Sequence, residues 1–139
     1  MSGIHLKIPA HADHIDIVRL CLSGISSNSG FSYEDIEDMK IAVAEACNNA
    51  VLYGYLDGSE GFIDIWFDID ETSITIKVKD SGLSFDYTVA ADKASPYMNE
   101  RVSNLRVGGL GIYLMQALMD EVTISTEMGT EVVMTKYIQ

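Results

Sequence analysis

Two polar side chains interrupt an otherwise small and apolar stretch, which reads Glu-Ala-Cys-Asn-Asn-Ala at residues 45–50. Glu45 and Asn49 are four residues apart, so on a helix they lie on one face, one turn from each other. A carboxylate there can act as a general base, and the amide oxygen can bind Mg²⁺, which takes only one or two protein oxygens and fills its shell with phosphates and water. Because polar pairs at this spacing also occur on solvated helix surfaces, the pair by itself leaves both interpretations open.

A second candidate is the tripeptide Asp80-Ser81-Gly82, which directly follows a predicted strand. Aspartate and glycine after a strand most often form a turn. A carboxylate at a strand end can also accept a hydrogen bond from the amino group of adenine, and a glycine beside it lets a ring approach the backbone closely. Both interpretations are kept at this point.

The third candidate is the glycine-rich stretch that includes Gly108, Gly109 and Gly111 and opens a predicted helix. Such glycines either form a flexible connector or direct backbone N–H groups at phosphates, helped by the helix dipole. The sequence has no GxxxxGK[S/T] loop, and Leu114 occupies the place of the third glycine in the dinucleotide fingerprint. If this stretch binds phosphate, it therefore belongs to neither of these common loop types.

Hydrophobic spacing predicts the elements that position these residues. Alternating apolar residues predict strands at 4–8, 63–69, 74–78, 122–126 and 131–137, and helical spacing predicts helices at 15–25, at 33–53 after a capping box formed by Ser32 and Asp35, and after Gly111. The short link 70–72 predicts an antiparallel hairpin. Residues 85–106 lack apolar periodicity, as in a functional lid or a disordered insertion. The pattern predicts an α+β fold, with an antiparallel or mixed sheet and helices on one face.

Composition narrows the function classes. A length of 139 residues predicts one domain, and 47% hydrophobic residues suffice for a core. Nine basic against 21 acidic residues give a net charge of -12, which disfavours direct nucleic-acid binding and favours a basic partner. No apolar run approaches the roughly 20 residues of a membrane span, and no secretory signal pattern is visible, so we expect a cytoplasmic protein. Cys21 and Cys47 are expected to be buried reduced thiols, and the three histidines to lie on the surface.

The order of these parts resembles the N, G1 and G2 boxes of the GHKL ATPases, which have the Bergerat fold. A helix with Glu-x-x-x-Asn comes first, then a hairpin ending in Asp-x-Gly, a polar lid and a Gly-Gly-x-Gly helix start. Over nearly the whole chain, the sequence is similar to the RsbW-type anti-sigma-B factors in four phrases: EACNNAV at 45–51, GLGIYLM at 109–115, LMDEV at 118–122 and TKY at 135–137. It departs from the family at 52–55, Leu-Tyr-Gly-Tyr, where the family often has a histidine.

The resemblance implies a role for each matching residue. Glu45 would be the catalytic base and Asn49 the magnesium ligand, and Asp80 with Gly82 would bind adenine. The implied phosphate-binding residues are Gly108, Gly109, Leu110, Gly111 and Ile112, with Arg106 reaching the γ-phosphate from a mobile lid at about 85–107.

The implied fold is a two-layer α/β sandwich over residues 1–139, with a mixed but mostly antiparallel sheet that binds Mg-ATP on its helical side. The implied function is ATP-dependent phosphorylation of a serine on an anti-anti-sigma protein, in competition with a sigma-B-like factor for binding to this chain. The resemblance also implies a homodimer. The alternative is a nucleotide-gated binding switch without phosphotransfer, although such a switch has no use for a base at Glu45. A gyrase-type clamp is disfavoured, since no transducer domain follows.

Overall fold

The computed structural model describes residues 2–54, 61–81, 110–126 and 129–139. Gly82, the predicted lid at 85–107, Gly108 and Gly109 lie outside these residues. In the described parts of the chain, no helix has the length and apolarity that crossing a membrane requires.

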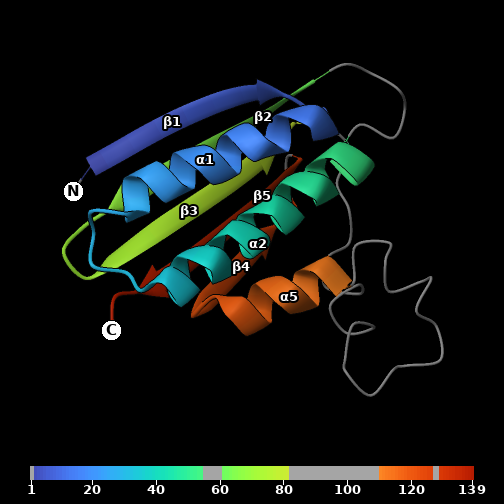
Figure 1. Cartoon of the computed structure of the whole chain (residues 1–139). Coiled ribbons are helices and arrows are strands. Elements are labelled where there is room, and N and C mark those ends of the chain that lie inside the picture. The colour runs from blue at the N-terminus through green and yellow to red at the C-terminus, as the bar shows by residue number, and fades with distance from the viewer. Residues whose placement is uncertain (1, 55–60, 82–109, 127–128) are drawn as a thin grey trace.

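In the described residues, five strands form one sheet in the order β1-β2-β3-β5-β4 (Figure 1). The strands are β1 (Ser2–Pro9), β2 (Phe62–Ile69), β3 (Ser73–Asp80), β4 (Glu121–Ser125) and β5 (Thr130–Tyr137). All four neighbouring pairs are antiparallel, so the described sheet contains no parallel pair of the kind that a mixed sheet would have. Asp70 closes the predicted β2–β3 hairpin, because its Oδ1 atom accepts hydrogen bonds from the backbone N–H groups of Thr72 and Ser73 at 2.8 and 2.9 Å.

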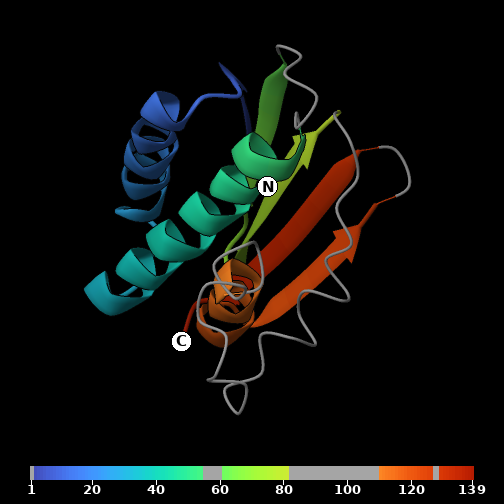
Figure 2. The same cartoon turned by 90° about the vertical axis from the view of Figure 1, so that its right-hand side faces the viewer.

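In the part of the chain that the structure describes, three helices cover one face of this sheet: α1 (Ile15–Ser26), α2 (Tyr33–Asn49) and α5 (Leu110–Leu118) (Figure 2). A short 3-10 helix, η1 (Ala12–His14), precedes α1. The α+β, two-layer prediction is therefore confirmed for the described residues. The opposite face of the sheet has no helix among these residues, which is common for an antiparallel sheet whose strands alternate apolar and polar residues.

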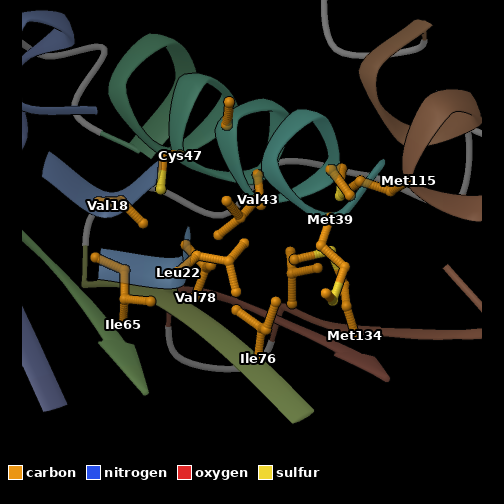
Figure 3. Close-up of a cluster of buried hydrophobic side chains, with 14 of the residues drawn as sticks. Val18, Leu22, Met39, Val43, Cys47, Ile65, Ile76, Val78, Met115 and Met134 are labelled. Carbon is orange, nitrogen blue, oxygen red and sulfur yellow. The ribbon is translucent and has the colours of Figure 1, made fainter. Parts of the chain in front are cut away.

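The core lies between the helices and the inner face of the sheet. Strand alternation places every second residue on this face, and helical spacing turns one stripe of each helix toward it. Figure 3 shows side chains from both layers meeting there: Val18, Leu22, Met39, Val43, Cys47 and Met115 from the helices, and Ile65, Ile76, Val78 and Met134 from the strands. All ten are buried.

The outer face carries polar and aromatic cross-strand pairs. The Nε2 atom of His5 lies 2.8 Å from Oδ1 of Asp64, and the His5 ring stacks on Trp66 with 4.7 Å between centroids. Lys77 places its Nζ atom 5.0 Å from the centre of the Trp66 ring. Pairs of this kind stabilise a solvated sheet face by about 0.2–1 kcal/mol each.

The start of α2 agrees with the predicted helix, and its end differs from it. Ser32 is the N-cap, and its side chain accepts a hydrogen bond from the N–H of Asp35 at 3.1 Å, as the capping box predicts. The α-helical part of the predicted helix ends earlier than expected, at Asn49. A π-helical turn, η2 (Ala50–Gly54), follows it. The wider turn therefore begins immediately after the predicted magnesium ligand.

The cysteines are free, but only Cys47 is fully buried, whereas Cys21 is half-buried. Burial raises the pKa of the Cys47 thiol to about 12, with a smaller opposing effect of the Arg19 charge. Cys47 is therefore an inert thiol of the core. The prediction of two buried thiols is wrong for Cys21, since this residue packs at the margin of the core.

The turn between β4 and β5 requires a glycine at 129. Gly129 has a φ of +77°, and a Cβ atom there would overlap the backbone carbonyl oxygen of Asp80. Gly24 in α1, by contrast, has nothing within 4 Å of an added Cβ.

We predict that Gly129→Ala lowers the free energy of unfolding by more than about 1 kcal/mol, because it combines a left-handed φ with a steric overlap. The matched variant Gly24→Ala should leave stability unchanged or raise it by up to about 1 kcal/mol, since alanine is favoured in a helix. Urea unfolding of both variants measures the difference. Equal stabilities would show that the turn relaxes at no cost.

Candidate functional site

The predicted catalytic and metal-binding residues meet the start of α5. A Cβ atom on Gly111 would lie 2.8 Å from Oε2 of Glu45 and 3.5 Å from Nδ2 of Asn49. Real Cβ atoms do not approach neighbours as closely as 2.8 Å, so a side chain at 111 would require the end of the flexible Glu45 side chain to move. The structure therefore brings Glu45, Asn49 and Gly111 together.

Glu45 is half-buried between α2 and its neighbours. Burial raises the pKa of its carboxyl group above the ordinary value for glutamate, while the nearby charge of Arg19 in α1 acts in the opposite direction. A carboxylate that has partly lost its water is a stronger base than a solvated one. The helix surface at Glu45 is thus partly shielded from solvent, and the role of Glu45 as a base stays a prediction.

Asn49 is 3% exposed, and its Nδ2 atom has no hydrogen-bond partner among the described residues. A buried polar group without a partner costs about 1–3 kcal/mol, so its presence calls for an explanation. The nitrogen and oxygen of an amide can exchange places by rotation, so either atom can occupy this position. The side chain therefore has spare capacity to bind a ligand.

The amide of Asn49, whose Nδ2 atom has no partner among the described residues, bears on whether this site fits Mg²⁺. The described residues contain no group of three or more His, Cys, Asp or Glu side chains that could enclose a metal ion. Magnesium in phosphate-binding sites does not need such a group, because phosphate oxygens and water complete its shell. The oxygen of the Asn49 amide fits the part of a single protein ligand.

Asp80 ends β3 on the inner face of the sheet, where it is 3% exposed. Its register partners are Ile63 on β2 and Thr130 on β5, and Thr130 is equally buried. Because β3 contacts the η2 turn, Asp80 lies at the same end of the fold as the C-terminus of α2. Asp80 and Thr130 thus bring a carboxylate and a hydroxyl group to neighbouring positions at this end of the inner face.

Thr130 was not among the predicted site residues. The signal for it was present, since Thr130, Val132 and Met134 alternate on the inner face of β5. The pairing of β5 with β3 was not predictable from this alternation, and only that pairing places the Thr130 hydroxyl next to Asp80.

The remaining predicted residues divide into two groups. Leu110 begins α5 and is 38% exposed, whereas the Ile112 side chain is fully buried, so only its backbone N–H could bind a ligand. The first-turn N–H groups of a helix have no partner within the helix, which suits them to anions. Gly82, Arg106, Gly108 and Gly109 lie outside the described residues and stay predictions.

Comparisons with known proteins identify the family of the chain. Residues 8–136 match the family model of the histidine kinase-like ATPase domain. Serine-protein kinase RsbW of Staphylococcus aureus strain MSSA476 is 47% identical over 138 residues, which is 98% of this chain and 87% of that protein. The protein of the same name from strain JH9 is 46% identical with the same coverage.

A solved structure shares the fold. The RsbU and RsbW domains of Rv1364c from Mycobacterium tuberculosis match 98% of this chain with a TM-score of 0.69 and 22% identity, and this chain spans about a third of that one, 32%. At this identity the likeness shows the fold alone, whereas the family match and the staphylococcal sequences cover nearly the whole chain at much closer similarity. The chain therefore belongs to the family of histidine kinase-like ATPase domains and, within it, to the RsbW serine-protein kinases.

Proposed function

We propose that this chain transfers the γ-phosphate of ATP to a serine of an anti-anti-sigma protein, and that it sequesters a sigma factor when that antagonist is not bound. The observation that carries the proposal is the contact of Gly111 with Glu45 and Asn49. It places a desolvated carboxylate, a buried amide without a partner and the start of a helix at one point.

Glu45 acts as the general base. It accepts the proton of the serine hydroxyl group as the serine oxygen bonds to the γ-phosphorus, and the bond from that phosphorus to the β–γ bridging oxygen breaks, which leaves ADP. Its partial burial favours this role, because desolvation makes the carboxylate readier to take up a proton. A switch that only binds nucleotide has no need for such a group.

Asn49 holds Mg²⁺ through its amide oxygen. The bound ion supplies positive charge that stabilises the phosphate oxygens during transfer. The burial of Asn49 keeps its side chain at the site, where a rotation of the amide is enough to present the oxygen.

Asp80 accepts a hydrogen bond from the amino group of adenine, and Thr130 lies close enough to share in recognition of the base. The first-turn N–H groups at Leu110, Gly111 and Ile112 bind phosphate oxygens. Gly82 beside the base, Gly108 and Gly109 at the phosphates and Arg106 at the γ-phosphate complete the proposed site.

The partners follow from the family and the charge. The net charge of -12 suits basic protein surfaces such as those of a sigma-B-like factor, and it disfavours DNA. We further propose a cytoplasmic homodimer. The outer face of the sheet, which no described helix covers and on which Phe62 is half exposed, is available for such an association.

The roles of Glu45 and Asn49 predict different losses. Glu45→Ala should leave ATP binding nearly intact and lower phosphotransfer by about 10²–10⁴-fold, because only the proton acceptor is removed. Asn49→Ala should instead weaken magnesium-dependent ATP binding. Calorimetry and transfer of labelled phosphate to the purified antagonist measure the two effects. Glu37→Ala, two turns earlier on α2 and paired with Lys40, is the matched control and should behave like wild type. Phosphotransfer at the wild-type rate in Glu45→Ala would show that Glu45 is not the catalytic base.

Asp80 should determine which nucleotide base the site prefers. Asp80→Asn should weaken ATP binding by roughly 5- to 150-fold, which corresponds to about 1–3 kcal/mol for a buried polar group that loses its partner. Wild type should also prefer ATP to GTP. Asp64→Asn is the control, because Asp64 pairs with His5 on the outer face of β2, and it should not change the affinity for ATP. Equal affinities of wild type and Asp80→Asn would remove Asp80 from the site.

The close approach at Gly111 predicts coupling with Glu45. The added Cβ of Gly111→Ala should displace the Glu45 carboxylate, and phosphotransfer should fall by about tenfold or more, because small misplacements of a catalytic group are costly. In the Glu45→Ala background the same change should have little further effect. A double-mutant cycle of transfer rates tests this, and additive losses would contradict it.

A further inference from the structure

Lys136 lies on the core-facing side of β5, where an apolar residue would be expected. Thr130, Val132, Met134 and Lys136 alternate onto the inner face, and Lys136 pairs with the fully buried Ile74 of β3. The Lys136 side chain is only 12% exposed. Because a lysine is rarely buried without partners, this position requires groups that bind its ammonium group.

Those groups come from two helices. The Nζ atom of Lys136 donates a hydrogen bond to the backbone carbonyl of Leu118 at 2.7 Å and lies 3.9 Å from Oδ1 of Asp35. Leu118 is the last residue of α5, whose last turn has no basic residue of its own, and Asp35 lies in the first turn of α2. Carbonyls at a helix C-terminus attract a cation, so Lys136 supplies from β5 the charge that α5 lacks.

Further hydrogen bonds hold the same end of α5. The backbone N–H of Asp120 donates to the Thr135 carbonyl at 3.0 Å, and Oδ2 of Asp120 accepts from the N–H of Tyr137 at 2.7 Å. The Tyr137 hydroxyl also donates to Glu121. We call this group, with Lys136, Leu118 and Asp35, the α5 latch. It joins the two phrases of the sequence, 118–122 and 135–137, that the nucleotide site does not use.

The latch and the catalytic contact lie at opposite ends of the same pair of helices (Figure 1). Gly111 precedes Leu118 by seven residues, or about 10 Å of helix, and Glu45 follows Asp35 by ten residues, or about 15 Å. A helix of this length moves as a rigid body, so its fixed end sets where its other end lies. A slide of α5 along α2 by a fraction of a turn would separate Gly111 from Glu45.

We propose that Lys136 is a positioning residue for phosphotransfer, which holds α5 against α2 so that Gly111 stays in contact with Glu45 and Asn49. This inference rests on the proposed kinase function. Lys136 does not touch the nucleotide site itself, and it acts through the placement of α5.

The test uses Lys136→Met in the full chain, because methionine keeps the apolar stem and removes the charge. We expect kcat for phosphotransfer to fall by about tenfold or more, while ADP affinity changes by less than about threefold, since ADP lacks the transferred phosphate. Lys136→Arg should recover most of the rate, because a guanidinium group can bind the same carbonyl. The matched control is Lys77→Met on β3, which removes a lysine from the outer face and should keep the wild-type kcat.

Hydrogen exchange of the α5 amides, residues 110–118, gives a second readout that does not depend on catalysis. It should be faster in Lys136→Met with ADP bound and close to wild type in Lys136→Arg and Lys77→Met. If the wild-type protein transfers no phosphate, the proposed function fails. The hydrogen exchange of the α5 amides then tests by itself whether Lys136 holds α5 in place.

Unchanged kcat and unchanged α5 exchange in a folded Lys136→Met protein would overturn the inference, as would a lower melting temperature with a normal kcat. If Lys136→Met does not fold, Asp120→Ala takes its place, because the Asp120 side chain is exposed and its loss removes only the bond to Tyr137. That variant should show the same changes to a smaller extent, and wild-type values for both would again overturn the inference.

Discussion

The close contact of α5 with α2 at Gly111 is the constraint on which the rest of the site depends. With no side chain at 111, the start of α5 lies directly against Glu45 and Asn49, and both lose water that they would keep on an open helix face. Burial raises the pKa of Glu45, and the Nδ2 atom of Asn49 is buried without a hydrogen-bond partner among the described residues. A side chain at 111 would require the Glu45 carboxylate to move away from the start of α5.

The core makes this contact possible. Large apolar side chains fill the space between the helices and the sheet, and such close-packed interiors change shape very little under strain. Among the described residues, three of the four buried polar ones, Asn49, Asp80 and Thr130, lie at the end of the fold that carries the proposed site. The buried Nδ2 atom of Asn49, which has no partner among the described residues, lowers stability, and a ligand that pairs with the amide would restore it by binding only the folded state.

The turn after α2 links the two halves of the site. The π-helical turn η2 starts at Ala50, directly after Asn49, and contacts β3, the strand that ends at Asp80. Single π-turns are rare and are found mostly at functional sites, because their wider backbone changes the direction of the chain at a fixed residue. In this fold the turn connects the proposed metal ligand with the proposed base-recognition end of the sheet.

The sequence by itself determined the elements and their order. Alternation of apolar residues located the strands, helical spacing and the Ser32 cap located the helices, and the order of the motifs indicated the family, because these signals are local and depend on neighbours along the chain. Tertiary structure alone decided which residues of different helices and strands contact one another. The approach of Gly111 to Glu45, the pairing that sets Thr130 beside Asp80 and the reach of Lys136 to α5 join residues far apart in sequence. No local pattern encodes such distances, since they result from how the whole core packs.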